Sequence, residues 1–272
     1  MHLLKDSIFL AFTDSRIALG YLGGFVARAS TVAISLFIPL FVNTFFISNG
    51  FCQGSPHDPS PELKKECRSA YILSSILTGV AQMAALLCAP FFGYLSHRRG
   101  RGLNLPIIVS AVFGMVGYII LPQLSSPEYK NENGRGGTAW IFLVVILLGI
   151  SQIGAIVCSL ASLSQGVLAA EAARPSIVEP SLAPGDDEST EAEPLLRLST
   201  ERNHVSRVQL KGSIAGVYSL SGGIAILLLT KLGGFLFDHL TTGAPFYMMA
   251  AFNAILLLAS LGIDASETYS RA

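Results

Sequence analysis

The feature that most constrains this chain is a set of six long runs with few or no charged residues. Each run is long enough for a helix that crosses a hydrocarbon core of about 30 Å, which takes roughly 20 residues. Because lipid cannot satisfy backbone hydrogen bonds, only helices or closed barrels span it, and runs this long predict helices. We therefore expect an all-α membrane protein with six transmembrane helices. The six runs are Leu19–Ile47, Ala70–Leu95, Leu105–Leu121, Thr138–Val167, Gly212–Phe237 and Ala244–Ile263.

Composition supports this class and argues against others. The chain is 51% hydrophobic and 13% charged, whereas soluble domains carry about 25% charged residues. Its formal net charge is zero, so no overall field favours nucleic acid as a partner. The spans contain no His-Glu zinc motif, no Gly-x-Ser-x-Gly nucleophile motif and no paired aspartates. We therefore expect neither an enzyme nor a bound metal or other cofactor.

Hydrophilic segments divide the chain between its membrane-spanning parts. We expect a cytosolic N-terminal segment at 1–18, four transmembrane helices within 19–167, a disordered cytosolic linker at 168–211, two helices within 212–263 and a cytosolic tail at 264–272. The linker contains four prolines and the acidic run GDDESTEAE. It has no helical apolar period, so it cannot bury enough apolar area to offset the entropy of ordering.

A short motif in the linker bears on the choice of membrane. The stretch EAEPLLRL places Glu191 four residues before Leu195 and one more before Leu196. This pattern resembles acidic dileucine sorting signals, which route membrane proteins to endosomal or vacuolar membranes. The alternative is ordinary linker sequence, because so short a pattern arises often by chance. The expected location is the plasma membrane or a vacuolar or endosomal membrane.

The orientation of the spans follows from the lysines and arginines of the short loops, which favour the cytosolic side. The Ser96–Asn104 loop contains three arginines, whereas Leu124–Gly137 contains one lysine and one arginine. A cytosolic arginine loop and six crossings place both termini in the cytosol. The loop at Ser48–Ser69 opposes this orientation, because it would carry three basic residues on the outer side.

The four cysteines fall into two kinds. Cys52 and Cys67 lie in one outer loop, where an oxidising compartment would allow a disulfide; the alternative is two free thiols. Cys88 and Cys158 lie within spans and are interpreted as small apolar packing residues.

Two spans carry stripes of small residues along one side. Such stripes let helix backbones approach closely where lipid provides no hydrophobic drive for association. We expect both to mark tight packing within a compact bundle. The third span carries Ser110, Gly114 and Gly117, and the fifth carries Gly212, Gly216, Ser219 and Gly223.

Polar residues inside spans are the candidates for a transport pathway. Arg28 is the strongest of these candidates, because charged residues within spans are costly and tend to be functional. The alternative is that its long side chain extends to the cytosolic interface. Residues at helical spacing share a face, and such polar faces either line a cavity or form hydrogen bonds between helices. The other candidates are Asn43, Ser75, Thr78, Gln82, Gln152, Ser159, Tyr218 and Asn253, with Tyr71 and Ser162 on the same polar faces.

The loop between the second and third spans resembles a known motif. GYLSHRRGRG is similar to the G-x-x-x-D-R/K-x-G-R/K-R/K loop motif of the major facilitator superfamily, with Gly93, Arg98, Gly100 and Arg101 on matching positions. The acidic position is His97 here, so the acidic part of the cytosolic latch that this motif implies is in doubt. The last basic position is a glycine.

Two further stretches share this resemblance. In GGFLFDHLTTGAPFYMMAAFNAIL, Gly234 and Asp238 look like the turn between the last two helices of the superfamily, and LGYLGGFVARASTVAISLFIPLFV resembles the helix that opens the second half of fungal drug-transporter-like members. The resemblance implies a C-terminal half with three plus three helices. We therefore expect part of an alternating-access transporter for a small organic solute.

The partners expected from this resemblance include a second six-helix unit. Either the chain is a fragment with a missing N-terminal half, or it is a half-transporter that pairs with a second chain. No Asp or Glu lies in the middle of a span, so if H+ is the coupling ion its carboxylate lies elsewhere. The alternative to transport is a non-transporting six-helix membrane partner or scaffold protein.

Overall fold

The computed structural model describes residues 14–51, 67–97, 104–129, 137–172 and 212–269. Within these ranges it contains helices and no strands. Six helices are long and apolar enough to cross a membrane, which confirms the all-α membrane class predicted from the sequence. The spans are Ser15–Ser48, Arg68–Ser96, Leu105–Gln123, Trp140–Leu168, Gly212–His239 and Ala244–Ser266.

The first span consists of three consecutive pieces: α2 (Ser15–Val32), the π-helical segment η1 (Ala33–Phe37) and α3 (Ile38–Ser48). It begins where the side chain of Asp14 accepts a hydrogen bond from the backbone N–H of Arg16 (2.8 Å), the usual role of an N-cap aspartate. In η1 the hydroxyl of Ser35 donates to the carbonyl of Thr31 (2.7 Å). Such back-bonding loosens and bends a helix locally.

The fifth span has the same kind of interruption. It contains η4 (Leu229–Gly233), also π-helical, followed by α9 (Gly234–His239). The hydroxyl of Thr230 donates to the carbonyl of Ile226 (2.8 Å). The two π-helical segments lie against each other, because a Cβ atom at Gly233 would lie 3.2 Å from the ring of Phe37.

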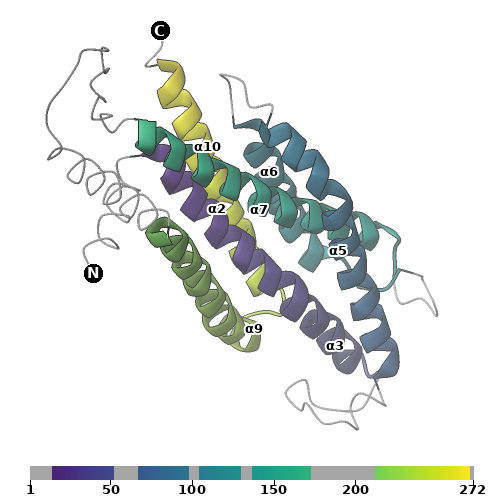
Figure 1. Cartoon of the computed structure of the whole chain (residues 1–272). Helices are drawn as coiled ribbons and strands as arrows, with labels where there is room; N and C mark the ends of the chain where they lie inside the picture. Colours follow the sequence, from purple (N-terminus) through teal and green to yellow (C-terminus); the bar gives the residue numbers. More distant parts are fainter. Residues whose placement is uncertain (1–13, 52–66, 98–103, 130–136, 173–211, 270–272) are drawn as a thin grey trace, which may run out of the picture.

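The fourth span, α7 (Trp140–Ala172), is the central helix of the bundle (Figure 1). It packs against α2, against the second span α5 (Arg68–His97) and against the third span α6 (Leu105–Ile120), which continues into the short η2 (Leu121–Gln123). The sixth span, α10, packs on α6 and α2 and runs over residues 244–269.

Two spans lie at opposite edges of this arrangement, α5 on one side and the fifth span on the other (Figure 1). In the most apolar window of each of these two, 28% of the residues are buried, against 56% in the first and fourth spans. The core therefore lies along α7 and α2. Its largest fully buried side chain, Tyr118 on α6, shares a 2.6 Å hydrogen bond with Ser30 on α2.

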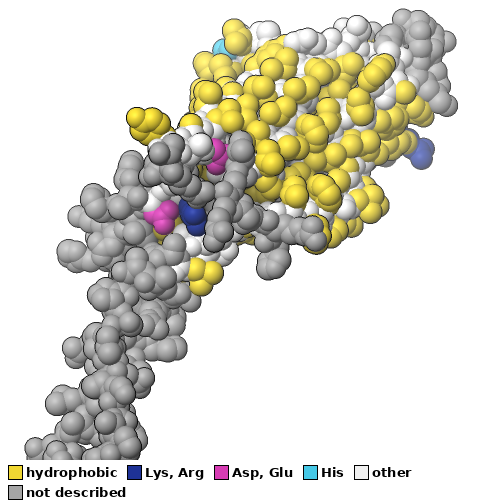
Figure 2. Space-filling model, turned by 90° about the horizontal axis from the view of Figure 1, so that it is seen from above, with side chains coloured by type: hydrophobic (Ala, Val, Ile, Leu, Met, Phe, Trp, Pro, Cys, Tyr) yellow, Lys and Arg dark blue, Asp and Glu magenta, His cyan; other side chains and the backbone are white. Residues whose placement is uncertain are grey.

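The outer surface of the described helices is largely apolar. Figure 2 shows hydrophobic side chains over most of one face, with the charged side chains near its margins. Many large side chains on this surface are more than half exposed, among them Leu86, Leu87 and Leu258. A helix bundle with such a surface is stable in lipid rather than in water.

Two helix ends differ from those expected. α7 continues through Ala172, into the range expected as linker, and α10 continues through Tyr269, into the range expected as the cytosolic tail. The remainder of the linker lies outside the described residues. It follows the fourth span, so it separates four helices from two and does not divide the six into three plus three.

Asp264 gives the physical reason for the longer α10. This residue is buried, and its carboxylate accepts hydrogen bonds from the backbone N–H of Asn104 (2.8 Å) and from the Asn104 side-chain amide. Asn104 precedes α6, and its carbonyl accepts from the N–H groups of Ile107 and Ile108. The last turns of α10 are therefore fixed to the first turn of α6.

Candidate functional site: a polar chain at the middle of the bundle

Three spans are joined by a chain of side-chain hydrogen bonds. Gln82 on α5 donates to the amide oxygen of Gln152 on α7 (3.4 Å), and Gln152 donates to the hydroxyl of Thr31 on α2 (3.1 Å). Thr31 in turn donates to the carbonyl of Ala27 (3.1 Å). Each group donates to the next, so the chain is directional, and it starts at an amide that is exposed.

The depth of this chain follows from where its members lie along their helices. Gln82 lies at the midpoint of the 30-residue α5, and Thr31 lies at the midpoint of the 34-residue first span. Gln152 is buried between them. A helix of 30 residues is about 45 Å long, longer than a hydrocarbon core of about 30 Å, so its midpoint lies well inside the membrane.

Arg28 lies one helical turn from Thr31, on the same side of α2. Its side chain is exposed, and its stem passes over the fifth span, where a Cβ atom at Gly222 would lie 2.7 Å from the Arg28 Cγ. The absence of a side chain at Gly222 therefore makes room for the arginine. Within the described residues, Arg28 makes no ion pair and no hydrogen bond.

A second polar contact joins α7 to the fifth span. The hydroxyls of Ser159 and Tyr218 are 3.2 Å apart. Tyr218 also covers Gly24 on α2, where any Cβ atom would overlap its ring. Ser159 is fully buried and also bonds its own helix, donating to the carbonyl of Ile156. This pair therefore holds the edge helix against the core.

The remaining pathway candidates bond within their own helices or within the core. Ser75 and Thr78 donate to carbonyls of α5 one turn back. Asn253 on α10 is buried, donates to the carbonyl of Met249 and accepts from Ser151 on α7, away from Gln152. The amide oxygen of Asn43 is buried with no hydrogen-bond partner among the described residues.

The residues of the two resemblance motifs are not brought together by the structure. Gly93 lies within α5 with no atom near its Cβ position, and His97 is the last residue of that helix. Gly234 and Asp238 lie in α9, where Asp238 is exposed. Six motif residues lie outside the described residues: Arg98, Gly100, Arg101, Glu191, Leu195 and Leu196.

The cysteines show one cross-link. Cys67 is buried at the start of α5 and is disulfide-bonded. Cys88 and Cys158 are free thiols. Cys52, the remaining cysteine of the chain, lies outside the described residues.

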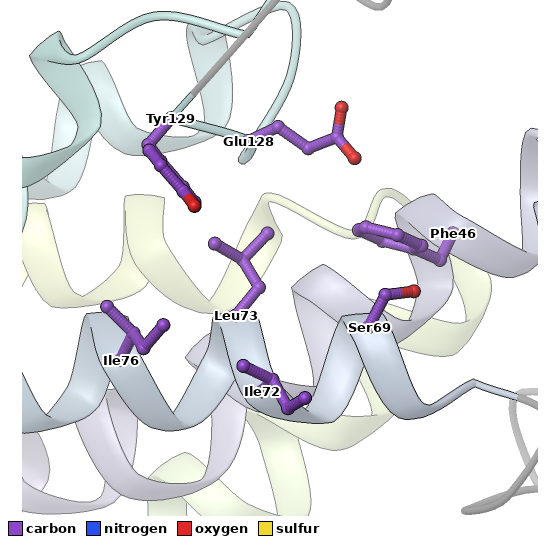
Figure 3. Close-up of a pocket in the computed structure, with 7 residues that line it drawn as sticks. All are labelled: Phe46, Ser69, Ile72, Leu73, Ile76, Glu128 and Tyr129. Carbon is purple, nitrogen blue, oxygen red and sulfur yellow. The ribbon is translucent and has the colours of Figure 1, made fainter. Parts of the chain in front are cut away.

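A cavity of about 240 Å³ lies at the same end of the bundle as Cys67, away from the polar chain. Figure 3 shows it between α5, the end of α3 and the segment after η2. The hydroxyl of Tyr129 points toward Leu73, whereas the carboxylate of Glu128 points away from it. The other lining residues are Phe46, Ser69, Ile72 and Ile76. None of the sequence candidates lies in this cavity.

Comparison with known proteins identifies no relative: no family model, curated protein or solved structure matches the chain. The described residues contain no group of three or more His, Cys, Asp or Glu side chains that could hold a metal ion. The polar chain and its neighbour Arg28 present two amides, a hydroxyl and a guanidinium, groups that can form hydrogen bonds and, for the guanidinium, a charge pair.

Sequence reasoning singled out Arg28, Gln82 and Gln152 but missed two residues of the polar contacts, Thr31 and Asp264. Thr31 ends the polar chain, and its three-residue spacing from Arg28 was the available signal. No sequence pattern indicated the contact of Asp264, because an acidic side chain at the end of an apolar run is expected to be solvated.

Proposed function

We propose that this chain is a six-helix unit of an alternating-access secondary transporter that moves a small organic solute across a membrane. In this proposal the unit works with a second six-helix unit, and the solute is held between them near the middle of the membrane. The similarity of the GYLSHRRGRG loop and the two other stretches to major facilitator sequences supports the proposal from the side of the sequence.

The observation that carries the proposal is the polar chain from Gln82 through Gln152 to Thr31, with Arg28 one turn away. Polar and charged groups that face lipid at mid-depth cost free energy, so such groups usually face protein or a water-filled cavity. The exposed members are Gln82, on the edge helix α5, and Arg28, beside the other edge helix, the fifth span. Their exposure at this depth supports polar or water-filled surroundings at each of them rather than lipid.

The proposed orientation places the arginine loop before Asn104 and both termini in the cytosol, in a plasma, vacuolar or endosomal membrane. The disulfide at Cys67 supports this orientation, because it lies at the end of α5 opposite His97. Disulfides persist in secretory and extracellular compartments rather than in the cytosol. Labelling cysteines introduced at the exposed Tyr269 and Trp140 with a membrane-impermeant maleimide tests it, and labelling at position 269 from outside would reverse the orientation.

The function is tested by uptake into proteoliposomes that contain the full chain, using radiolabelled lactate, glucose, glycine and choline as one solute of each charge type. We expect at least one solute to accumulate above protein-free liposomes. The variants Gln152→Leu and Gln82→Leu should lose this uptake, whereas Gln123→Leu, an exposed polar residue at the end of the third span, should keep it.

Assembly has to be measured on the same samples by size-exclusion chromatography. A chain that forms a dimer, and so contains two six-helix units, but moves none of the four solutes, or that moves one equally well in both glutamine variants, would reject the transport proposal. It would favour the non-transporting partner protein instead.

A further inference from the structure

Arg28 is a positive charge near the middle of a long apolar helix. The first span runs from Ser15 to Ser48, and Arg28 lies within four residues of its midpoint, which is about 5 Å along the axis. The side chain is exposed rather than enclosed. A cation at this depth is costly unless an opposite charge or water accompanies it.

The described part of the chain supplies no such opposite charge. The acidic side chains that it describes are at or near helix ends: Asp14, Glu128, Asp238 and Asp264. The carboxylate of Asp264 is already engaged by Asn104. The counter-charge of Arg28 therefore comes from outside these residues.

The arginine is nevertheless held in place. Its stem crosses the fifth span at Gly222, where a Cβ atom would lie 2.7 Å from Cγ and 3.6 Å from Cδ. This contact fixes the stem between two helices and leaves the guanidinium at the exposed end. A guanidinium that is positioned in advance loses less entropy when it binds a carboxylate, and its planar array of N–H groups matches both carboxylate oxygens.

The neighbouring groups add to the same preference. One turn further along α2, the hydroxyl of Thr31 is already occupied by Gln152, and Gln152 by Gln82. Gln82 is the first residue of the polar chain, and its amide is exposed. One N–H of this amide and its oxygen remain available to a solute. The exposed polar groups at this depth are thus a cation on α2 and a neutral amide on α5.

We propose that the solute recognised at Arg28 is an organic anion whose carboxylate binds the guanidinium. This proposal rests on the proposed function and specifies its substrate class. Arg28 supplies the charge that selects a carboxylate over its neutral amide.

Equilibrium dialysis of the purified full chain with matched radiolabelled pairs tests the charge preference. The pairs are benzoate with benzamide and succinate with succinamide, which differ mainly in charge. We expect at least one acid to bind about tenfold to a hundredfold more tightly than its amide, as a charge-assisted hydrogen bond allows. Arg28→Gln should remove this preference, and Arg28→Lys should retain part of it.

The matched control is Lys231→Gln, which removes an exposed cation from the fifth span at η4. It should leave the preference unchanged. Equal binding of acid and amide, unchanged selectivity in Arg28→Gln, or no binding of either acid would overturn the proposal. So would an Arg28→Gln variant that changes only the oligomeric state, because the counter-charge would then belong to another protein chain.

Uptake measurements separate this proposal from the proposed function. If glucose accumulates in a manner that depends on Gln152 but not on Arg28, transport stands and the anion preference fails. If benzoate or succinate binds through Arg28 but is not carried into proteoliposomes, the binding site stands and the transport function fails.

Discussion

The third and fifth spans carry similar stripes of small residues but use them in opposite ways. On α6, a Cβ atom at Gly117 would lie 2.8 Å from Leu148, and one at Gly114 would lie 2.7 Å from Asn253. On the fifth span, Cβ atoms at Gly216 and Gly223 would meet nothing within 4 Å. One stripe is therefore closed by other helices of the chain, whereas the other is open.

The difference separates the closed side of a helix, against which its neighbours pack, from its open side. The stripe of α6 lies on a closed side, facing α7 and α10. The open sides of the two edge helices, α5 and the fifth span, carry exposed glycines, and α5 also carries the exposed Gln82. A stripe of small residues thus indicates that another helix can pack closely against it. Whether a helix does so depends on how the neighbouring helices are arranged. Mutations that add a methyl group measure this difference directly.

The largest effect is expected at Gly149, where α7 touches the backbone of α5. A Cβ atom at this position would overlap the carbonyl oxygen of Ala81 and lie 2.8 Å from its carbonyl carbon. Because two backbones cannot separate locally, Gly149→Ala should lower the free energy of unfolding by about 3 kcal/mol. Unfolding of the purified chain in detergent, followed by circular dichroism, measures it.

The control for this variant is Gly79→Ala on the exposed face of α5, where no atom lies within 4 Å of the added methyl group. It should not lower the free energy of unfolding and should raise it by up to about 1 kcal/mol, because alanine is more favourable than glycine in a helix interior. Equal stabilities for the two variants would show that α5 and α7 are not packed backbone to backbone.

The next effect is expected at Asp264, which fixes α10 to α6 on the closed side. Asp264→Ala leaves the buried N–H of Asn104 without its acceptor, so we expect a loss of about 2 kcal/mol in the free energy of unfolding. Asp238→Ala removes an exposed carboxylate from α9 and should have little effect. If Asp264→Ala and Asp238→Ala unfold at the same denaturant concentration, the contact between Asp264 and Asn104 does not stabilise the protein.

A smaller effect is expected at Gly114. The added methyl group of Gly114→Ala would meet side chains of Ser151 and Asn253 rather than backbone. Side chains can turn aside, so the expected loss is about 1 to 2 kcal/mol. The same unfolding assay on the double variant with Asn253→Ala should show less than the sum of the two single effects. Strict additivity would mean that the two residues are not in contact.

The smallest effect on stability is expected on the open stripe. Gly223→Ala should not lower the free energy of unfolding, because nothing lies near the methyl group, and the higher helix propensity of alanine should raise it by up to about 1 kcal/mol. If a second unit packs against this stripe, Gly223→Leu should nevertheless reduce uptake in the proteoliposome assay. A Gly223→Leu variant that unfolds early would show that the stripe is closed within the chain.

Hydropathy predicted the six spans well because burial in lipid depends on the composition of a run and little on its neighbours. The same argument placed Gln82 and Gln152 on polar faces, since helical spacing alone determines a face. Neither argument determines which helix covers that face. The link from Gln152 to Thr31 and the closed and open stripes therefore required the structure.

Asp264 illustrates a second limit of the sequence. An acid at the end of an apolar run is normally solvated, so its position predicted a tail in water. The structure places it against Asn104, which is distant in sequence and close in space. Long-range polar pairs of this kind leave no local periodicity.

The π-helical segments η1 and η4 change which residues share a face of the first and fifth spans. One π turn holds one residue more than an α turn, so residues beyond it are displaced by about 100° around the axis. With this displacement Asn43, beyond η1, lies between the directions of Arg28 and Thr31 around the axis, whereas a continuous α-helix would turn it about 100° away. Deleting one residue from either segment would restore a continuous α-helix and also turn one end of that span away from its neighbours. The paired segments thus fix the rotational phase of the two spans relative to each other.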